Sequence, residues 1–129
     1  MEQPGQAVIV MDTNPQVLKG LTLLLEGMQF TVIAVSHPDE LHKITSSQST
    51  CPTLLLLPFE IIQGKSGMDQ VVRIRAAYQH SIPTILLSHE NGFRPDHFIG
   101  EDIVVLSDRI TPRDLRSNIA AILSRELAV

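Results

Sequence analysis

Polar residues with useful chemistry stand at or just after the ends of four apolar runs in this 129-residue chain. Asp12 and Thr13 follow the first run, Ser88 closes the fourth, and Glu60 and Asp108 come shortly after the third and fifth. Carboxylate and hydroxyl oxygens are hard ligands that suit a cation such as Mg²⁺. Asp12 and Glu60 are therefore the two candidates for a weak metal site.

Each of these residues also has a purely structural interpretation. Asp12 can cap the following helix or hold a turn, and Ser88 can bond the adjacent backbone at a strand end. Glu60 can be a solvated loop carboxylate, because unpaired glutamates are seldom buried. The residue types alone leave these alternatives open.

The third apolar run ends on a residue with no side-chain chemistry. Residues 53–60 read TLLLLPFE, so Pro58 stands where the strand should end. Four consecutive leucines suit a strand buried on both faces, and ligands of open parallel sheets bind at the carboxyl ends of such strands. A proline costs little there, because the hydrogen-bond ladder is ending and its missing N–H is not needed.

Five short apolar runs predict the strands of the fold. They are AVIVM at 7–11, TVIAV at 31–35, TLLLL at 53–57, TILLS at 84–88 and IVVL at 103–106. The runs are rich in leucine or β-branched residues and lack strict alternation, which is typical of strands covered by helices on both faces.

Helical periodicity fills most of the segments between these runs. We expect the first helix to start at Asn14-Pro15, and the last to have Thr111 as N-cap and Pro112 at its first position. Segment 90–102, ENGFRPDHFIGED, has few apolar residues and a central proline. A fourth helix there is expected to be short or poorly formed, one or two turns at best.

Strands and helices alternate five times, which predicts an α/β fold with a doubly wound, five-stranded parallel sheet of the flavodoxin-like (βα)₅ type. Residues 1–6 are expected to form a disordered lead, and residues 7–127 a single domain that belongs to a larger polypeptide.

Composition excludes several function classes. The chain has a net charge of −4 and no basic stripe, which disfavours nucleic-acid binding. It has no apolar run long enough to cross a membrane and no secretory leader. Cys51 is the only cysteine, which suits a reducing cytosol. We therefore expect a cytoplasmic domain without membrane contact.

The chain from Ala7 to Leu123 resembles the receiver domain of bacterial two-component signalling, the chemotaxis-regulator-like module that accepts a phosphoryl group. The landmarks are VIVMDTNPQVLKGLTLLLEGMQFTVIAV, CPTLLLL, IPTILLSHE and TPRDLRSNI. The spacing from Pro58 to Gly67 is one residue longer than in the commonest receivers. This longer loop is similar to that of receivers in hybrid sensor histidine kinases.

The resemblance implies which positions would carry phosphotransfer. Two of the three acidic positions hold a residue that is not an acid. Receivers hold Mg²⁺ on an acid pair after the first strand, and this pair falls on Asp12 and Thr13, so one carboxylate is replaced by a hydroxyl. The aspartate that accepts the phosphoryl group after the third strand falls on Pro58, which cannot be phosphorylated.

The remaining positions implied by the resemblance are also altered, with one exception. The hydroxyl after the fourth strand falls on Ser88 and is kept. The lysine after the fifth strand falls on Asp108, a reversal of charge, and the proline that usually follows is Arg109. The aromatic switch residue falls on Val105.

We therefore expect a degenerate receiver, a pseudo-receiver in a response regulator or a hybrid sensor histidine kinase. It would act as a phosphorylation-independent interaction or regulatory module, with no enzymatic activity in this domain even if the parent protein is a kinase. Expected partners are proteins, namely a kinase, an output domain or another signalling domain, and homodimerisation is allowed. We expect no cofactor, and Mg²⁺ at most weakly bound.

Three alternatives remain. A relay receiver could use a neighbouring carboxylate such as Glu60 as its acceptor. A flavin-binding protein has the same topology, although the MDTNP loop lacks the Ser/Thr/Gly-rich phosphate cradle. A zinc site could be formed by the residues His89, Glu90, Asp96 and His97 of one loop, although their spacing matches no strong zinc-ligand pattern.

The reversed charge at Asp108 needs compensation if it lies close to Asp12. Arg109, or Lys65 from the long loop, is the candidate partner of Asp108 in a local ion pair.

Overall fold

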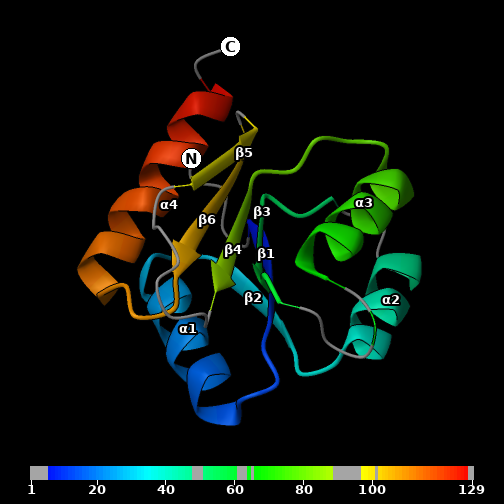
Figure 1. Ribbon diagram of the computed structural model, residues 1–129, viewed down its shortest axis with the longest axis horizontal. Coiled ribbons are helices and arrows are strands. Elements are labelled where there is room, and N and C mark those ends of the chain that lie inside the picture. Colours follow the sequence, from blue (N-terminus) through cyan, green and yellow to red (C-terminus); the bar gives the residue numbers. More distant parts are fainter. Residues whose placement is uncertain are drawn as a thin grey trace.

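A six-stranded sheet lies at the centre of the computed structural model, which describes residues 6–47, 51–60, 64, 66–88, 97–100 and 102–127 (Figure 1). The strands are β1 (Ala7–Met11), β2 (Thr31–Val35), β3 (Leu54–Pro58), β4 (Thr84–Ser88), β5 (His97–Gly100) and β6 (Ile103–Ser107). Their order across the sheet is β2-β1-β3-β4-β6-β5. The first five strands in this order run parallel, and β5 alone runs antiparallel, along β6.

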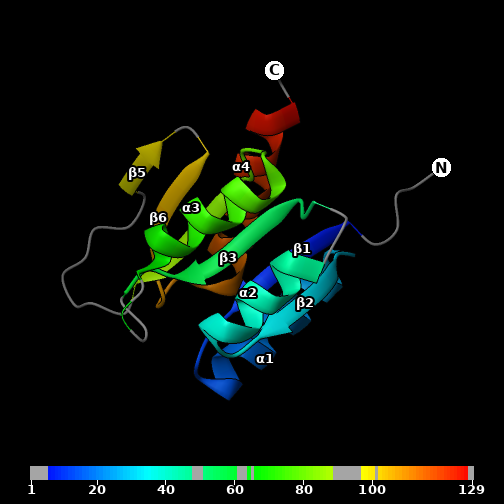
Figure 2. The same cartoon turned by 90° about the vertical axis from the view of Figure 1, so that its right-hand side faces the viewer.

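Four helices cover the two faces of the sheet among the described residues. They are α1 (Pro15–Gly27), α2 (Pro38–Ser47), α3 (Gly67–Tyr78) and α4 (Pro112–Leu127). Helices α1 and α4 lie on one face, and α2 and α3 lie on the other (Figures 1 and 2). The predicted flavodoxin-like, doubly wound arrangement of five parallel strands is confirmed. None of the described helices combines the length and apolar character that crossing a bilayer requires.

The helix starts at Asn14 and Thr111 are confirmed. The Asn14 side-chain oxygen accepts from the backbone N–H of Gln16 at 2.9 Å, and proline occupies the start of α1. Thr111 Oγ1 accepts from the N–H of Asp114 at 3.1 Å, and α4 begins at the next residue, Pro112. In both cases a short polar side chain satisfies an N–H that has no partner within the helix.

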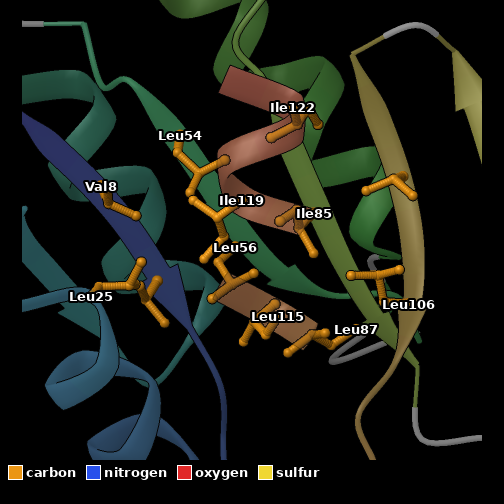
Figure 3. Packing of buried hydrophobic residues seen from close by; sticks show 12 residues of the cluster. Val8, Leu25, Leu54, Leu56, Ile85, Leu87, Leu106, Leu115, Ile119 and Ile122 are labelled. Carbon is orange, nitrogen blue, oxygen red and sulfur yellow. The ribbon is translucent and has the colours of Figure 1, made fainter. Parts of the chain in front are cut away.

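Two hydrophobic clusters hold the layers together, one on each face of the sheet. Figure 3 shows the cluster in which Leu115, Ile119 and Ile122 of α4 and Leu25 of α1 pack against the strands. The opposite cluster joins alternate residues of the same strands to α2 and α3, including Leu41, Val71 and Ile74. Strand β3 contributes to both clusters and is buried along its whole length. This explains why its sequence shows leucines without alternation.

The segment between β4 and β6 differs from the sequence expectation. A short fourth helix was expected here, but His97–Gly100 form strand β5 and pair with β6, with an irregularity between Phe98 and Gly100. Phenylalanine and isoleucine favour strands, and β5 pairs with the edge of β6 that a five-stranded sheet would leave open. Residues 89–96 and 101 lie outside the described part of the chain.

The first described residue is Gln6, whose carbonyl accepts from the N–H of Thr31 at 3.0 Å. The rest of the expected disordered lead, residues 1–5, lies outside the described residues.

The proline at the end of β3 causes no gap in the ladder. Pairing of β3 with β1 ends at Leu56, whereas pairing with β4 continues to Pro58. The N–H groups of Leu55 and Phe59 donate toward β4, at 2.9 and 2.8 Å. Because successive N–H groups of a parallel strand alternate between its two neighbours, the nitrogen of Pro58 faces β1, beyond the end of that ladder. The missing donor is therefore not needed.

Helix α3 begins in direct contact with the end of β3, and Gly67 makes this approach possible. A Cβ placed on Gly67 would lie 2.3 Å from the carbonyl oxygen of Pro58 and 3.1 Å from the Phe59 Cα. The Gly67 N–H donates to the Phe59 carbonyl at 3.1 Å. The loop after β3 is thus fixed at both of its ends.

We predict that Gly67→Ala destabilises the protein, by about 1–3 kcal/mol, because backbone atoms must move to admit the methyl group. Gly20→Ala is the matched control, since Gly20 lies within α1 and has open space around its Cβ position. The control should gain about 0.5–1 kcal/mol from improved helix propensity. Urea unfolding of both variants measures the difference, and equal effects would contradict the close contact.

Candidate functional site

The candidate site lies at the carboxyl ends of the parallel strands β1, β3, β4 and β6, which meet at one edge of the sheet. Asp12 directly follows β1, Pro58 ends β3, Ser88 ends β4, and Asp108 directly follows β6. Ligands of open α/β sheets bind at this edge, so the positions of these residues agree with the sequence analysis.

Asp12 is used by the turn that leads into α1. Its side chain is 3% exposed, and its Oδ1 accepts from the Asn14 N–H at 2.8 Å. Its own N–H donates to the carbonyl of Val35 at 3.3 Å. These contacts support the turn-holding interpretation, because a carboxylate that bonds the N–H two residues ahead stabilises this kind of turn. The neighbouring Thr13 is exposed.

The side chains of Ser88 and Glu60 are in contact, although Ser88 ends β4 and Glu60 follows the end of β3. Ser88 is fully buried, and its hydroxyl donates to Oε2 of the half-buried Glu60 at 2.5 Å. A carboxylate is a strong acceptor for a hydroxyl donor. Beyond the predicted roles of Glu60 as a solvated loop carboxylate and Ser88 as a strand-end hydroxyl, the structure adds a direct contact between their side chains.

The loop after β6 is attached to the same place. The N–H of Asp108 donates to the carbonyl of Ser88 at 2.8 Å, and the N–H of Arg109 donates to Ser107 Oγ at 3.1 Å. Asp108 and Arg109 have exposed side chains. Their proposed ion pair stays a prediction, and the alternative partner Lys65 lies outside the described residues.

Val105, at the position where the receiver resemblance places the aromatic switch, is wholly enclosed. It is 0% exposed and belongs to the cluster that α3 covers with Val71 and Ile74. A buried β-branched side chain has few rotamers, so it cannot swing between an inward and an outward position as a surface aromatic residue can.

No group of three or more metal-ligating side chains occurs in the part of the chain that the structure describes. His89, Glu90 and Asp96 of the sequence-predicted histidine group lie outside that part, and His97 is described only by its backbone. The weak Mg²⁺ site stays a prediction.

Structural comparison places these residues in a known framework. A response regulator receiver domain from Clostridium thermocellum superposes with a TM-score of 0.76 at 21% identity, covering 95% of this chain and 97% of that chain. The chain has the receiver fold. A response regulator receiver protein from Sinorhizobium medicae WSM419 has a TM-score of 0.75 at 16% identity, covering 93% of this chain and 95% of that chain.

A third structure with the receiver fold is the receiver domain of the hybrid histidine kinase CckA, with a TM-score of 0.71 at 15% identity. It covers 91% of this chain and 98% of that chain. No protein-family model and no curated protein matches the sequence. Likeness at these identities establishes the fold, and the function has to be argued from the site.

Sequence reasoning identified the site positions but missed the contact between Glu60 and Ser88. The signal was present in the topology, because both residues come from the carboxyl ends of neighbouring strands. It also missed Ser66, which caps α3 reciprocally with Asp69. The pattern of a serine followed three residues later by an acid could have found this cap.

We predict that Asp12→Ala lowers the free energy of unfolding by about 1 kcal/mol, because the turn before α1 loses its acceptor. Asp12→Asn keeps an acceptor oxygen and should lose less. Thermal unfolding with and without Mg²⁺ completes the test. If the ion raises the melting temperature of the wild type but not of Asp12→Asn, Asp12 is a metal ligand and the turn-holding interpretation fails.

Proposed function

We propose that this chain is a receiver-like signalling domain of a two-component or phosphorelay protein that acts without aspartyl phosphorylation. One observation carries the proposal: Pro58 ends β3, at the position where the receiver resemblance places the phosphorylated aspartate. Formation of an acyl phosphate requires a carboxylate oxygen as nucleophile, and proline offers none.

The surrounding charges support the same proposal. Phosphoryl transfer is catalysed mainly by positioning and by cations that neutralise the developing negative charge. The position of the receiver lysine carries Asp108, and the second member of the acid pair is Thr13. The remaining acid, Asp12, is engaged by the backbone of its own turn. We therefore propose no resident cofactor and at most weak Mg²⁺ binding.

The domain would act by binding other proteins through a surface of constant shape. Val105 cannot act as a rotating aromatic switch, and the described segment beside β6 is strand β5. We therefore propose that the domain binds its protein partners without a phosphorylation-driven change of its surface. The partners we propose are a kinase, an output domain or another signalling domain, and a second copy of the chain. The domain itself would be non-enzymatic, cytoplasmic and part of a hybrid kinase or response regulator.

The contact between Ser88 and Glu60 favours one alternative enough to test it. Glu60 places a carboxylate beside the hydroxyl that receivers retain, so it is the candidate acceptor of a displaced phosphorelay. Flavin binding has no comparable support. The N–H groups of Asn14, Gln16 and Val17, where a phosphate would bind before α1, already donate to Asp12 and Asn14 side chains.

Incubation with acetyl phosphate and Mg²⁺, followed by intact-mass measurement, tests the proposal. We expect no phosphoryl group to be added, while a receiver with an aspartate at the end of its third strand, run in parallel, gains one. A gain of one phosphoryl group on this chain would contradict the proposed function. Loss of that gain in Glu60→Gln would then assign the acceptor role to Glu60.

A further inference from the structure

We propose that Glu60 is an internal anion that permanently engages Ser88 and thereby holds the loops at the carboxyl edge of the sheet in one arrangement. The contact between the Ser88 hydroxyl and the Glu60 carboxylate is called the Ser88–Glu60 latch below. The inference rests on the proposed function, because a pocket that is never phosphorylated needs another way to fix its shape.

The burial of Ser88 explains why the latch is stable. Ser88 is 0% exposed, and an unpaired hydroxyl at such a site has lost its hydrogen bonds to water without replacement. Its bond to Glu60 replaces those hydrogen bonds with one to a carboxylate oxygen, which is a strong acceptor. Glu60 is only partly buried, so its carboxylate retains some solvation. The pair therefore avoids the full cost of burying an isolated charge.

The latch is part of a connected set of bonds across three loops. Beside it, the Phe59 N–H donates to the Leu87 carbonyl at 2.8 Å, and the Gly67 N–H donates to the Phe59 carbonyl. On the other side, the Asp108 N–H donates to the carbonyl of Ser88. The end of β4 is thereby bonded to the loop before α3 and to the loop before α4.

The charge of Glu60 also disfavours binding of an external anion at Ser88. An incoming phosphate would have to take the Ser88 hydroxyl from Glu60 and would meet the negative charge of that carboxylate at the same hydroxyl. Like charges at close range oppose such binding. The internal carboxylate thus supplies the acceptor for Ser88 and disfavours an external one.

The consequence is a single conformation of the surface around the starts of α3 and α4. In a domain with this latch, the starts of α3 and α4 keep their positions without a phosphoryl group or another modification. Partner recognition would then depend on the amount of the protein or on its location, and not on a covalent modification of this pocket.

A double-mutant cycle of Ser88→Ala and Glu60→Ala, read by amide hydrogen exchange in the full chain, tests the latch. We expect each single variant to speed exchange at the Phe59 and Asp108 amides about tenfold, and the double variant to add little, because both remove the same bond. Ser117→Ala and Glu26→Ala, exposed residues on α4 and α1, are the matched controls and should leave these amides unchanged.

Independent, additive effects of the two substitutions would overturn the latch. If Ser88→Ala fails to fold, Glu60→Ala alone decides: faster exchange at the Asp108 amide supports the latch, and unchanged exchange overturns it. If the exchange rates overturn the latch but acetyl phosphate adds no phosphoryl group, only the latch is wrong and the proposed function is retained. A phosphoryl gain removes the proposed function whatever the exchange rates are.

Discussion

Burial of β3 on both faces is the constraint on which the rest of the structure depends. Leu54, Leu55, Leu56 and Leu57 are at most 1% exposed, so the strand needs a hydrophobic layer above and below it. Helices α1 and α4 supply one layer, and α2 and α3 supply the other. Burying such a strand contributes about 1.5–3 kcal/mol for each large apolar side chain. The strand's carboxyl end is therefore held in place by packing, independently of any chemistry there.

This independence means that the fold does not depend on which residue ends β3. The nitrogen of Pro58 faces β1 beyond the last paired residue, so a proline at this position leaves the hydrogen-bond ladder intact. Among the described residues, Phe59 and Asp108 donate backbone hydrogen bonds to the end of β4, and Ser88 contacts Glu60. A carboxylate is still present at the site, but it serves a buried hydroxyl of the same chain.

The five parallel strands and the starts of the first and last helices could be predicted, because each depends on local signals. Runs such as TLLLL have no other stable place than a sheet covered on both sides, and the Asn14-Pro15 and Thr111-Pro112 pairs are strong helix starts. Strand β5 could not be predicted, because four residues carry little periodicity and their conformation depends on pairing with β6.

The sequence predicted where the site residues lie in the fold, but not which of their side chains contact one another. Strand ends place Asp12, Pro58, Ser88 and Asp108 at one edge whatever their side chains do. Which polar groups bond one another depends on the local geometry around each strand end, such as the close approach of Gly67 to Pro58. Sequence periodicity carries no information on that contact, so the pairing of Glu60 with Ser88 was missed.

Binding of beryllofluoride with Mg²⁺, an analogue of the aspartyl phosphate, tests the central claim most directly. The account predicts that the amide spectrum of the chain stays unchanged around Asp12, Phe59 and Ser88. Strand β3 ends on Pro58 and not on an aspartate that could bind the analogue, and the Ser88 hydroxyl is already engaged. Large, saturable shifts at Asp12 and Ser88 would show a working phosphorylation pocket and contradict the account.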